Sequence, residues 1–389
     1  MQSQLPFMFV QNERVFVRAD LNVPLKNGII EDDFRLKAAQ PTLDLLLAEG
    51  ARIVIGTHIG RPTGYDKHLS TTHLIPWFRD HSYTAFFAST LEEAYIYSQR
   101  LKPGELLIVE NLRFSEHEKQ PSYVFATQLA RLADYYINDA FGLLHRNDTS
   151  ITLLPQLYPK EKKTIGLLVE KELSVLEHLR TNARRPFLIF LGGGKVKDKL
   201  PLIEQILPFV DTVVVGPALS FTFLKAQGHS IGRSLVEDSL ISTAHAIYKK
   251  AKELQVKLLL PHDYLIALNT IRGPVEIVPA DAIPERGIGL TVGPKTLELY
   301  EKEVLQAGTI VLNGSMGIEE QPQSLESMYI LLRTIAQSTA YSMIGGGESV
   351  AAVYHYGLEL DISFCSSGGG STLAYLSHRE LPGLLAMDS

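Results

Sequence analysis

The chain has 389 residues, 45% hydrophobic and 21% charged, with a formal net charge of −6 at pH 7, so it can bury sizeable cores but has no general attraction to nucleic acid or acidic membranes. Its single cysteine, Cys365, excludes an intrachain disulfide and a cysteine-based metal cluster. No run of about 18 apolar residues occurs. We therefore expect a cytoplasmic protein of about two domains that acts on small anions and not on nucleic acid or membranes.

The N-terminal half alternates short apolar runs with amphipathic stretches. A hairpin turn is predicted at 26–28 and a helix at 35–49. The predicted strands are 15–17, 53–56, 85–87, 106–109 and 135–137. This βα rhythm predicts a mostly parallel sheet covered by helices.

Polar clusters follow four of these strands. They read RADLNVP (18–24), THIGRP (57–62), ENLRF (110–114) and NDAFGLLHR (138–146). Ligands bind outside the carboxyl ends of the strands in open α/β sheets, so five arginines should converge there on an anion: Arg18, Arg35, Arg61, Arg113 and Arg146. Each arginine alone is equally well explained as a surface or ion-paired residue. Likewise, His58 is either a base or a hydrogen-bonding group, and Asp20 and Asn22 either shape the turn or hold a substrate hydroxyl.

The segment 167–181 has helical periodicity without a breaker and is the predicted connector to a second βα series. Strands are predicted there at 187–191, 212–215, 258–260, 310–312, 342–344 and 362–364. Glycine triplets follow three of these strands, at 192–194, 345–347 and 368–370. Three such triplets, each before a helix-like stretch, favour a cradle for nucleotide phosphate and ribose over chance tight turns.

Two lysines follow the first glycine triplet. Lys195 and Lys199 are four residues apart at the predicted start of a helix, where like charges repel and the helix dipole is unfavourable to cations. A bound polyanion would reverse both effects. The alternative is that both lysines extend from an ordinary solvated helix.

Together these motifs resemble phosphoglycerate kinase over essentially the whole chain. The matching stretches, in order, are RADLNVP, HIGRP, ENLRF, NDAFG with HR, EKEL, GGGKVKDK, LKAQGH, DAIP, VGPKT, NGSMGIEE, GGGES and SSGGGST. The resemblance implies two Rossmann-like three-layer α/β domains with parallel sheets, facing across a cleft and joined by a hinge helix. It implies a 3-phosphoglycerate domain at 1–166, to which the tail 376–389 returns, an interdomain helix at 167–181 and a nucleotide domain at 182–375.

The implied reaction is reversible phosphoryl transfer between 1,3-bisphosphoglycerate and ADP, giving 3-phosphoglycerate and ATP with Mg²⁺, in a monomer. The triose substrate would be held by Asp20, Asn22, Arg35, His58, Arg61, Arg113 and Arg146. The nucleotide would be held by Lys199, Asn313, Glu320, Gly346, Gly347, Glu348 and Ser349, with Glu348 at the metal. Catalysis would fall to Arg35, Lys195, Lys199 and Gly369.

Five stretches depart from the family pattern. GGGD becomes GGGE at Glu348, NGPMG becomes NGSMG at Ser315, and the tryptophan before Asn313 becomes Leu312. GGGMA or GGAMA becomes GPALS (216–220), and HRAHAS becomes HRNDTS (145–150). We expect these changes to affect nucleotide affinity more than substrate identity.

Two alternatives remain at this level. A dinucleotide oxidoreductase would also have Rossmann-like halves, but the GxGxxG fingerprint after a first strand is missing. A binding protein of the kinase fold would not need to retain Arg35, Lys195, Lys199 and Glu320 together.

Overall fold

The structure, a computed structural model, describes residues 10–388, so the first nine residues of the predicted N-terminal domain and Ser389 lie outside it. The chain divides into two compact units. The first runs to Val175 and resumes at Glu380, and the second spans Leu176–Arg379. This division falls inside helix α7 (Leu167–Asn182), in the segment predicted as the connector.

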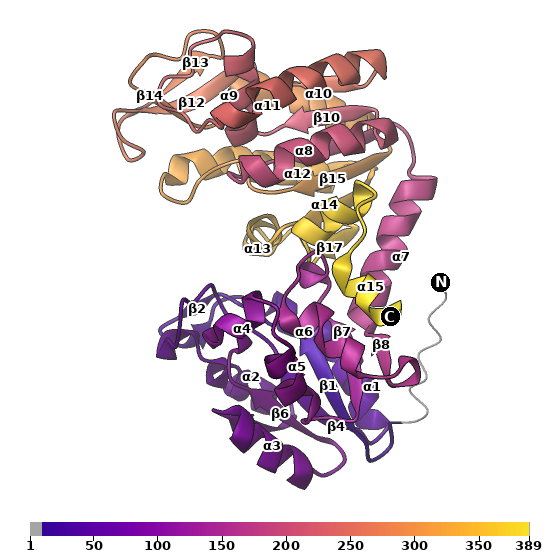
Figure 1. Cartoon of the computed structure of the whole chain (residues 1–389). Helices are drawn as coiled ribbons and strands as arrows, with labels where there is room; N and C mark the ends of the chain where they lie inside the picture. Colours follow the sequence, from indigo (N-terminus) through magenta and orange to yellow (C-terminus); the bar gives the residue numbers. More distant parts are fainter. Residues whose placement is uncertain (1–9, 389) are drawn as a thin grey trace. The chain divides into compact units, whose positions relative to one another are not determined.

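The first unit is built on a six-stranded parallel sheet ordered β5-β6-β4-β1-β7-β8 (Figure 1). Its strands are β1 (Arg14–Ala19), β4 (Arg52–Gly56), β5 (Thr84–Ala88), β6 (Glu105–Val109), β7 (Tyr135–Asp139) and β8 (Lys163–Ile165). A small hairpin, β2 (Leu25–Lys26) and β3 (Ile29–Ile30), turns through Asn27 and Gly28, which both have positive φ, as the type I′ turn requires.

Helices cover both faces of this sheet because its strand residues alternate between two apolar cores. Val15 and Val17 belong to one core with Leu43 of α1, whereas Phe16 belongs to the other with Leu129 of α5. The helices of this unit are α1 (Phe34–Ala48), α2 (Ile75–Asp80), α3 (Leu91–Arg100), α4 (Glu116–Lys119), α5 (Tyr123–Ala130), α6 (Thr149–Thr152) and α15 (Pro382–Asp388). Helix α15, yellow in Figure 1, packs on α6 and β8.

The second unit has a six-stranded parallel sheet ordered β11-β10-β9-β15-β16-β17. This is the strand order of a doubly wound nucleotide-binding fold, with its switch point between β9 and β15. The strands are β9 (Phe187–Leu191), β10 (Thr212–Val215), β11 (Lys257–Leu259), β15 (Thr309–Asn313), β16 (Tyr341–Gly345) and β17 (Phe364–Ser366). The helices are α8 (Val196–Ile206), α9 (Pro217–Ala226), α10 (Ile241–Glu253), α11 (Pro294–Gln306), α12 (Leu325–Gln337), α13 (Gly347–His355) and α14 (Gly370–Leu376).

An antiparallel sheet in the second unit was not predicted. It is ordered β13-β12-β14 and consists of β12 (Asp263–Leu268), β13 (Val275–Pro279) and β14 (Gly287–Val292). Strand β8 of the first unit was not predicted either. Other differences are small: β17 begins two residues later than predicted, at Phe364, and Lys195 is the N-cap of α8 rather than part of its first turn.

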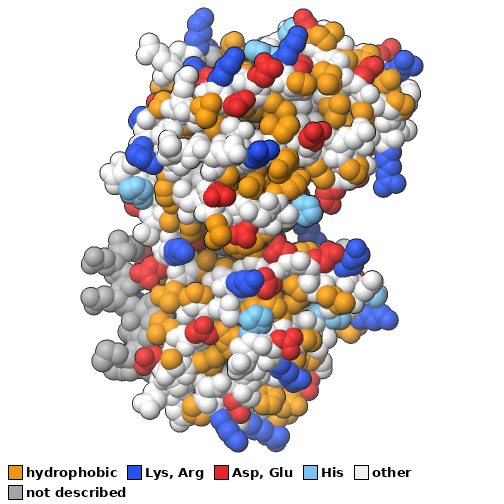
Figure 2. All heavy atoms as spheres, turned by 180° about the vertical axis from the view of Figure 1, so that it is seen from behind, with side chains coloured by type: hydrophobic (Ala, Val, Ile, Leu, Met, Phe, Trp, Pro, Cys, Tyr) orange, Lys and Arg blue, Asp and Glu red, His pale blue; other side chains and the backbone are white. Residues whose placement is uncertain are grey.

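The prediction of two α/β units with parallel sheets is confirmed. On the face seen in Figure 2, positive and negative side chains are interspersed with apolar ones, in keeping with the small net charge. Among residues 10–388, no helix has the length and apolarity needed to cross a membrane.

Candidate functional site

The predicted substrate residues of the first unit follow the carboxyl ends of β1, β4, β6 and β7, or begin α1. Strand β1 is the switch point of this sheet, since β4 pairs on one side of it and β7 on the other. Directly after β1, the buried Asp20 pairs with Arg35 through its Oδ2. Two residues later, the Asn22 Oδ1 accepts a hydrogen bond of 2.7 Å from the amide of Gly60 and thereby ties the loops after β1 and β4 together.

A second group forms around the 3₁₀ turn Leu112–Phe114 that follows β6. Arg113 is only 5% exposed and donates to the carbonyl of Gly60 at 3.0 Å. The carboxylate of Asp148, 3.5 Å from the Arg113 Nη2, also accepts from the Nε of Arg146 at 3.1 Å. Burial, with a smaller contribution from repulsion by Arg146 and against the opposing effect of Asp148, lowers the pKa of Arg113 to about 10. Arg113 therefore stays charged at neutral pH.

Arginines from both groups affect the protonation of His58. Its ring is 1% exposed, and burial holds the pKa of the imidazole well below its usual value. The positive charges that lower the pKa further come from Arg113, Arg18, Arg35 and Arg146. The neutral form of His58 therefore dominates at physiological pH, which is a state suited to hydrogen bonding rather than to salt-bridge formation.

Two of the five arginines expected to converge on an anion behave differently. Arg18 is fully buried, pairs with Glu118 at 3.4 Å and donates to the hydroxyl of Ser150 at 2.6 Å. Its guanidinium therefore makes contacts inside the protein. No sequence pattern indicates this pairing, because Glu118 is 100 residues away along the chain. Arg61 is exposed on the loop after β4.

In the second unit, the first predicted glycine loop touches the loop that follows β15, at the switch point of the sheet. The amides of Gly192 and Gly193 donate to the carbonyls of Asn313 and Ser315 at 3.0 and 2.7 Å. A Cβ on Gly192 would lie 2.3 Å from the backbone oxygen of Ser315, so only glycine allows this approach.

Lys199 lies beneath these loops. Its Nζ donates to the carbonyls of Gly192 and Asn313, the second at 3.1 Å. Burial lowers the pKa of Lys199 to about 8; the negative charge of Glu348 opposes this shift and the positive charge of Lys195 adds to it. Both Glu348 and Lys195 are exposed, so solvent weakens their effect on Lys199.

The other two glycine loops of the predicted nucleotide site also meet. A Cβ on Gly369 would lie 3.1 Å from the Cα of Gly346, and the side-chain amide of Asn313 donates to the carbonyl of Gly369 at 3.1 Å. Gly346 and Gly369 are the N-caps of α13 and α14. In the first turn of α13, Glu348 is exposed and the Ser349 hydroxyl is buried without a hydrogen-bond partner. Glu320 is exposed in the turn before Pro322.

A single carboxylate is the only acidic group predicted at the metal. Among residues 10–388, no group of three or more His, Cys, Asp or Glu side chains could hold a metal ion. Magnesium is commonly bound by one or two carboxylates together with substrate phosphates and water, so one carboxylate beside a phosphate site fits that ion.

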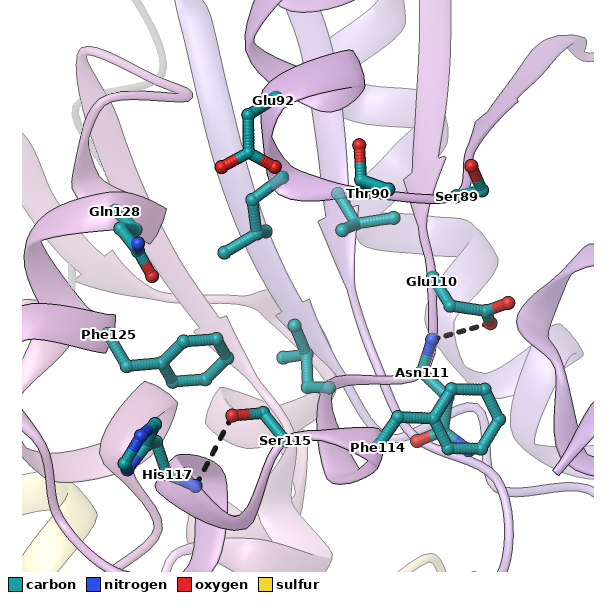
Figure 3. A pocket seen from close by; sticks show the side chains of 13 residues that line it. Ser89, Thr90, Glu92, Glu110, Asn111, Phe114, Ser115, His117, Phe125 and Gln128 are labelled. Atoms are coloured by element: carbon teal, nitrogen blue, oxygen red, sulfur yellow. Dashed lines mark hydrogen bonds between the residues drawn. The ribbon is translucent and has the colours of Figure 1, made fainter. Parts of the chain in front are cut away.

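A separate pocket of about 320 Å³ lies in the first unit between the N-terminus of α3 and helices α4 and α5 (Figure 3). Thr90, Glu92 and Gln128 line it together with Phe125 and His117. None of the predicted site residues lines it, although Leu112 and Phe114 do and flank Arg113 in the chain. Glu110 at its edge is already held by Ser70 and Thr71.

Arginines that follow the strands of one doubly wound sheet, and glycine loops around a lysine on the other, are the arrangement expected of an α/β phosphotransferase. Comparison with known proteins identifies the family. A sequence model of the phosphoglycerate kinase family matches residues 7–379, and the chain belongs to that family.

Its relatives span nearly its whole length. Phosphoglycerate kinase of a Nitratiruptor species is 37% identical over 381 residues, covering 96% of this chain and 95% of that one. The Thermus thermophilus enzyme is 38% identical over 384 residues, covering 97% of each. Among solved structures, Pyrococcus horikoshii phosphoglycerate kinase superposes with a TM-score of 0.84 at 29% identity, covering 97% and 96% of the two chains. The Coxiella burnetii enzyme gives 0.79 at 32% identity, covering 97% of both.

The family resemblance seen in the sequence is thus confirmed, and the oxidoreductase alternative is not supported. The chain is a phosphotransferase of glycolysis that interconverts 1,3-bisphosphoglycerate and ADP with 3-phosphoglycerate and ATP.

Proposed function

We propose that the first unit binds 3-phosphoglycerate through the seven residues predicted from the sequence. The observation that carries this proposal is a set of three buried polar atoms without partners, all on predicted residues: Asp20 Oδ1, His58 Nδ1 and Arg113 Nε. Buried polar groups are normally paired, so unpaired ones call for a ligand or water. An acceptor beside guanidinium donors suits a substrate that carries a hydroxyl, a carboxylate and a phosphate.

The nucleotide, in this proposal, binds to the second unit. Lys199 uses two of its three N–H donors on backbone carbonyls, which leaves one for a phosphate oxygen. Asn313, Gly346, Gly347 and Ser349 lie around the same loops, and Glu320 would take the ribose hydroxyls. The glycines permit close approach of phosphate to backbone amides.

Magnesium would reach this site with the nucleotide and be held by Glu348. When bound, the ion would neutralise phosphate charge and orient the phosphates. The negative charge of Glu348 raises the pKa of Lys199 against the effect of burial, which supports placing this carboxylate on the same side of the site.

Catalysis in this proposal relies on positioning and charge rather than on a covalent intermediate. Arg35, Lys195 and Lys199 would neutralise the phosphoryl group in transfer, and the Gly369 amide would donate to it. Because the substrates bind to different units, transfer requires the units to close and exclude water. We also propose that the protein acts as a monomer, since each predicted binding set lies within one chain, and that it works in the cytoplasm, in keeping with a family of glycolytic enzymes.

Calorimetric binding of the two substrates to single variants tests the assignment of each substrate to a unit. Arg146→Ala should weaken 3-phosphoglycerate about 10- to 100-fold and leave ADP unchanged, because hydrogen bonds to charged groups contribute about 1.5–3 kcal/mol. Lys199→Ala should do the reverse. If either variant weakens the other substrate instead, the assignment is wrong.

Each variant has a matched control in its own unit. Arg131→Ala removes an exposed arginine that lies over Tyr95, and Lys225→Ala removes a surface lysine paired with Asp238 at 2.7 Å. Neither control should change the affinity for either substrate.

A further inference from the structure

Asp148 begins helix α6 but does not cap it. Its backbone carbonyl accepts from the amides of Ile151 and Thr152 at 2.9 and 3.0 Å, as an N-cap residue does. An aspartate at this position usually accepts a further helix amide with its side chain. Here the side chain makes no cap hydrogen bond. The carboxylate turns instead to two arginines.

The carboxylate links two guanidinium groups, one buried and one partly exposed. The side chains of Asp148 and Arg113 are each 4% exposed, and that of Arg146 is 35% exposed. Burying a charge is unfavourable unless it is paired, so Asp148 and Arg113 depend on each other. Asp148 also offsets the repulsion between Arg113 and Arg146.

The other charged groups around Arg113 do not replace this link. Asp20 is already paired with Arg35, and Glu118 is paired with Arg18. The only other hydrogen bond of the Arg113 guanidinium within residues 10–388 is to the Gly60 carbonyl. Without Asp148, one backbone oxygen would therefore hold Arg113 beside like charges from Arg146 and Arg18.

We propose that Asp148 is a positioning residue for 3-phosphoglycerate: its carboxylate fixes Arg113 and Arg146 as a pair, so that their remaining N–H groups are pre-arranged for the anion. This inference rests on the proposed role of both arginines in substrate binding. Asp148 itself does not touch the substrate in this proposal, because its two carboxylate oxygens already accept from Arg113 and Arg146.

If Asp148 is neutralised, an argument from charge and an argument from geometry predict opposite changes in the KM for 3-phosphoglycerate. Asp148→Asn removes a negative charge from an anion site, so electrostatics alone would lower the KM for 3-phosphoglycerate. Positioning predicts the opposite, since the asparagine amide can accept from one arginine only while its NH₂ group faces the other. Misplacing a binding group by about 1 Å can reduce activity by about a hundredfold, so we expect the KM to rise at least about tenfold.

Asp148→Ser separates positioning from helix capping. Serine is as good an N-cap as aspartate, but it carries no charge to the arginines. If Asp148 merely supports α6, the serine variant should behave like the parent protein. If it positions the arginines, the serine variant should still show the raised KM, together with the lower melting temperature expected when the buried Arg113 loses its partner. It also keeps the test valid should Asp148→Asn fold poorly.

The experiment is steady-state kinetics of the full-length protein in the direction of ATP consumption, with melting temperatures for each variant. Both Asp148 variants should raise the KM for 3-phosphoglycerate and leave the KM for MgATP unchanged. Asp134→Asn is the matched control, because Asp134 pairs with Arg14 at 2.7 Å before the opposite, N-terminal end of β7. This control should change neither KM.

An unchanged or lowered KM for 3-phosphoglycerate in the Asp148 variants would overturn the inference. The Arg146→Ala variant separates that failure from a failure of the proposed function. If Arg146→Ala weakens 3-phosphoglycerate and the Asp148 variants do not, only the role of Asp148 is wrong. If Arg146→Ala also has no effect, the arginine site itself is wrong.

Discussion

The Nζ of Lys199 lies 3.1 Å from the carbonyl oxygen of Asn313, so the backbone rather than a carboxylate holds this ammonium group. Burial lowers its pKa to about 8. In the unfolded chain the pKa is near 10.5. Burial of the charged amine therefore lowers the free energy of unfolding by its full amount below pH 8, and this loss disappears as the pH rises toward 10.5. Phosphate binding has the opposite dependence, because only the protonated amine attracts it.

The kcat/KM for MgATP should therefore fall as the pH rises above about 8, since this ratio reports the free protein. The measurement is a pH profile at saturating 3-phosphoglycerate. Lys199→Arg should show a lower but flatter profile, because arginine remains charged throughout. A parent profile that stays flat to about pH 9.5, well past the lowered pKa, would remove Lys199 from the nucleotide site.

Arg35 should contribute to the rate more than to substrate affinity. It pairs with Asp20 and its side chain is 20% exposed, which leaves part of the guanidinium available to a ligand. Loss of one preorganised donor to the transition state typically costs about 3 kcal/mol, so Arg35→Ala should lower kcat a hundredfold or more with a smaller rise in KM. Lys37→Ala, which removes an exposed lysine paired with Asp33, is the control. A near-normal kcat in Arg35→Ala would exclude Arg35 from catalysis.

Much of the fold could be predicted because its strands are short, buried apolar runs. β9 was predicted at its observed limits, Phe187–Leu191, and every residue in it is buried. β13 was missed because its residues are exposed or half-buried and give no apolar run. β17 was placed two residues early because Ile362, although buried, lies in the turn that precedes the strand.

The loops of the candidate site could also be predicted, since polar residues and glycines follow strands in both units. The contacts inside those loops could not, because they join residues far apart in the chain. Arg18 looked like its four counterparts, yet Glu118 holds it in the interior. In the sequence, Asp148 is only part of a departure from the family pattern. Only the structure shows that its side chain pairs with two arginines and does not cap the helix.

Asp139 should make the stability of the first unit depend on pH. It is fully buried at the end of β7, and its Oδ1 accepts from the amides of Leu168 and Val169 at the start of α7. Burial raises the pKa of Asp139 to about 7. Because the folded state holds this proton more tightly than the unfolded state, the contribution to stability is full below pH 3.8 and is lost as the pH rises through 7.

Compared with Asp139→Asn, the parent protein should therefore lose stability between about pH 4 and 7, by about 4 kcal/mol in all, and the difference should be constant above that range. Trp77, the single tryptophan, lies in α2, so its fluorescence during unfolding follows the first unit alone. A difference between the two proteins that is independent of pH would show that Asp139 does not titrate in this range.

Glu348 should determine the magnesium concentration that the enzyme needs for activity. Glutamate keeps the charge that the ion needs but is one methylene longer than the aspartate of the family pattern, which moves the carboxylate by roughly 1 to 1.5 Å. We therefore expect an elevated KM for ATP or an elevated magnesium requirement together with an ordinary KM for 3-phosphoglycerate. Pro217 and Ala218, at the start of α9, should add to this effect by stiffening the loop after β10.

Two substitutions test this role. Glu348→Asp should lower the magnesium concentration needed for half-maximal activity, and Glu348→Ala should abolish most activity. Glu326→Ala is the matched control, because Glu326 likewise lies in the first turn of a helix, α12, of the same unit. A glutamate in the first turn stabilises either helix by about 0.3–1 kcal/mol through the helix dipole. Both alanine variants should therefore lose a similar amount of folding stability, and only Glu348→Ala should also lose metal binding. If both Glu348 variants follow the parent protein across a magnesium titration, the ion is held without this carboxylate.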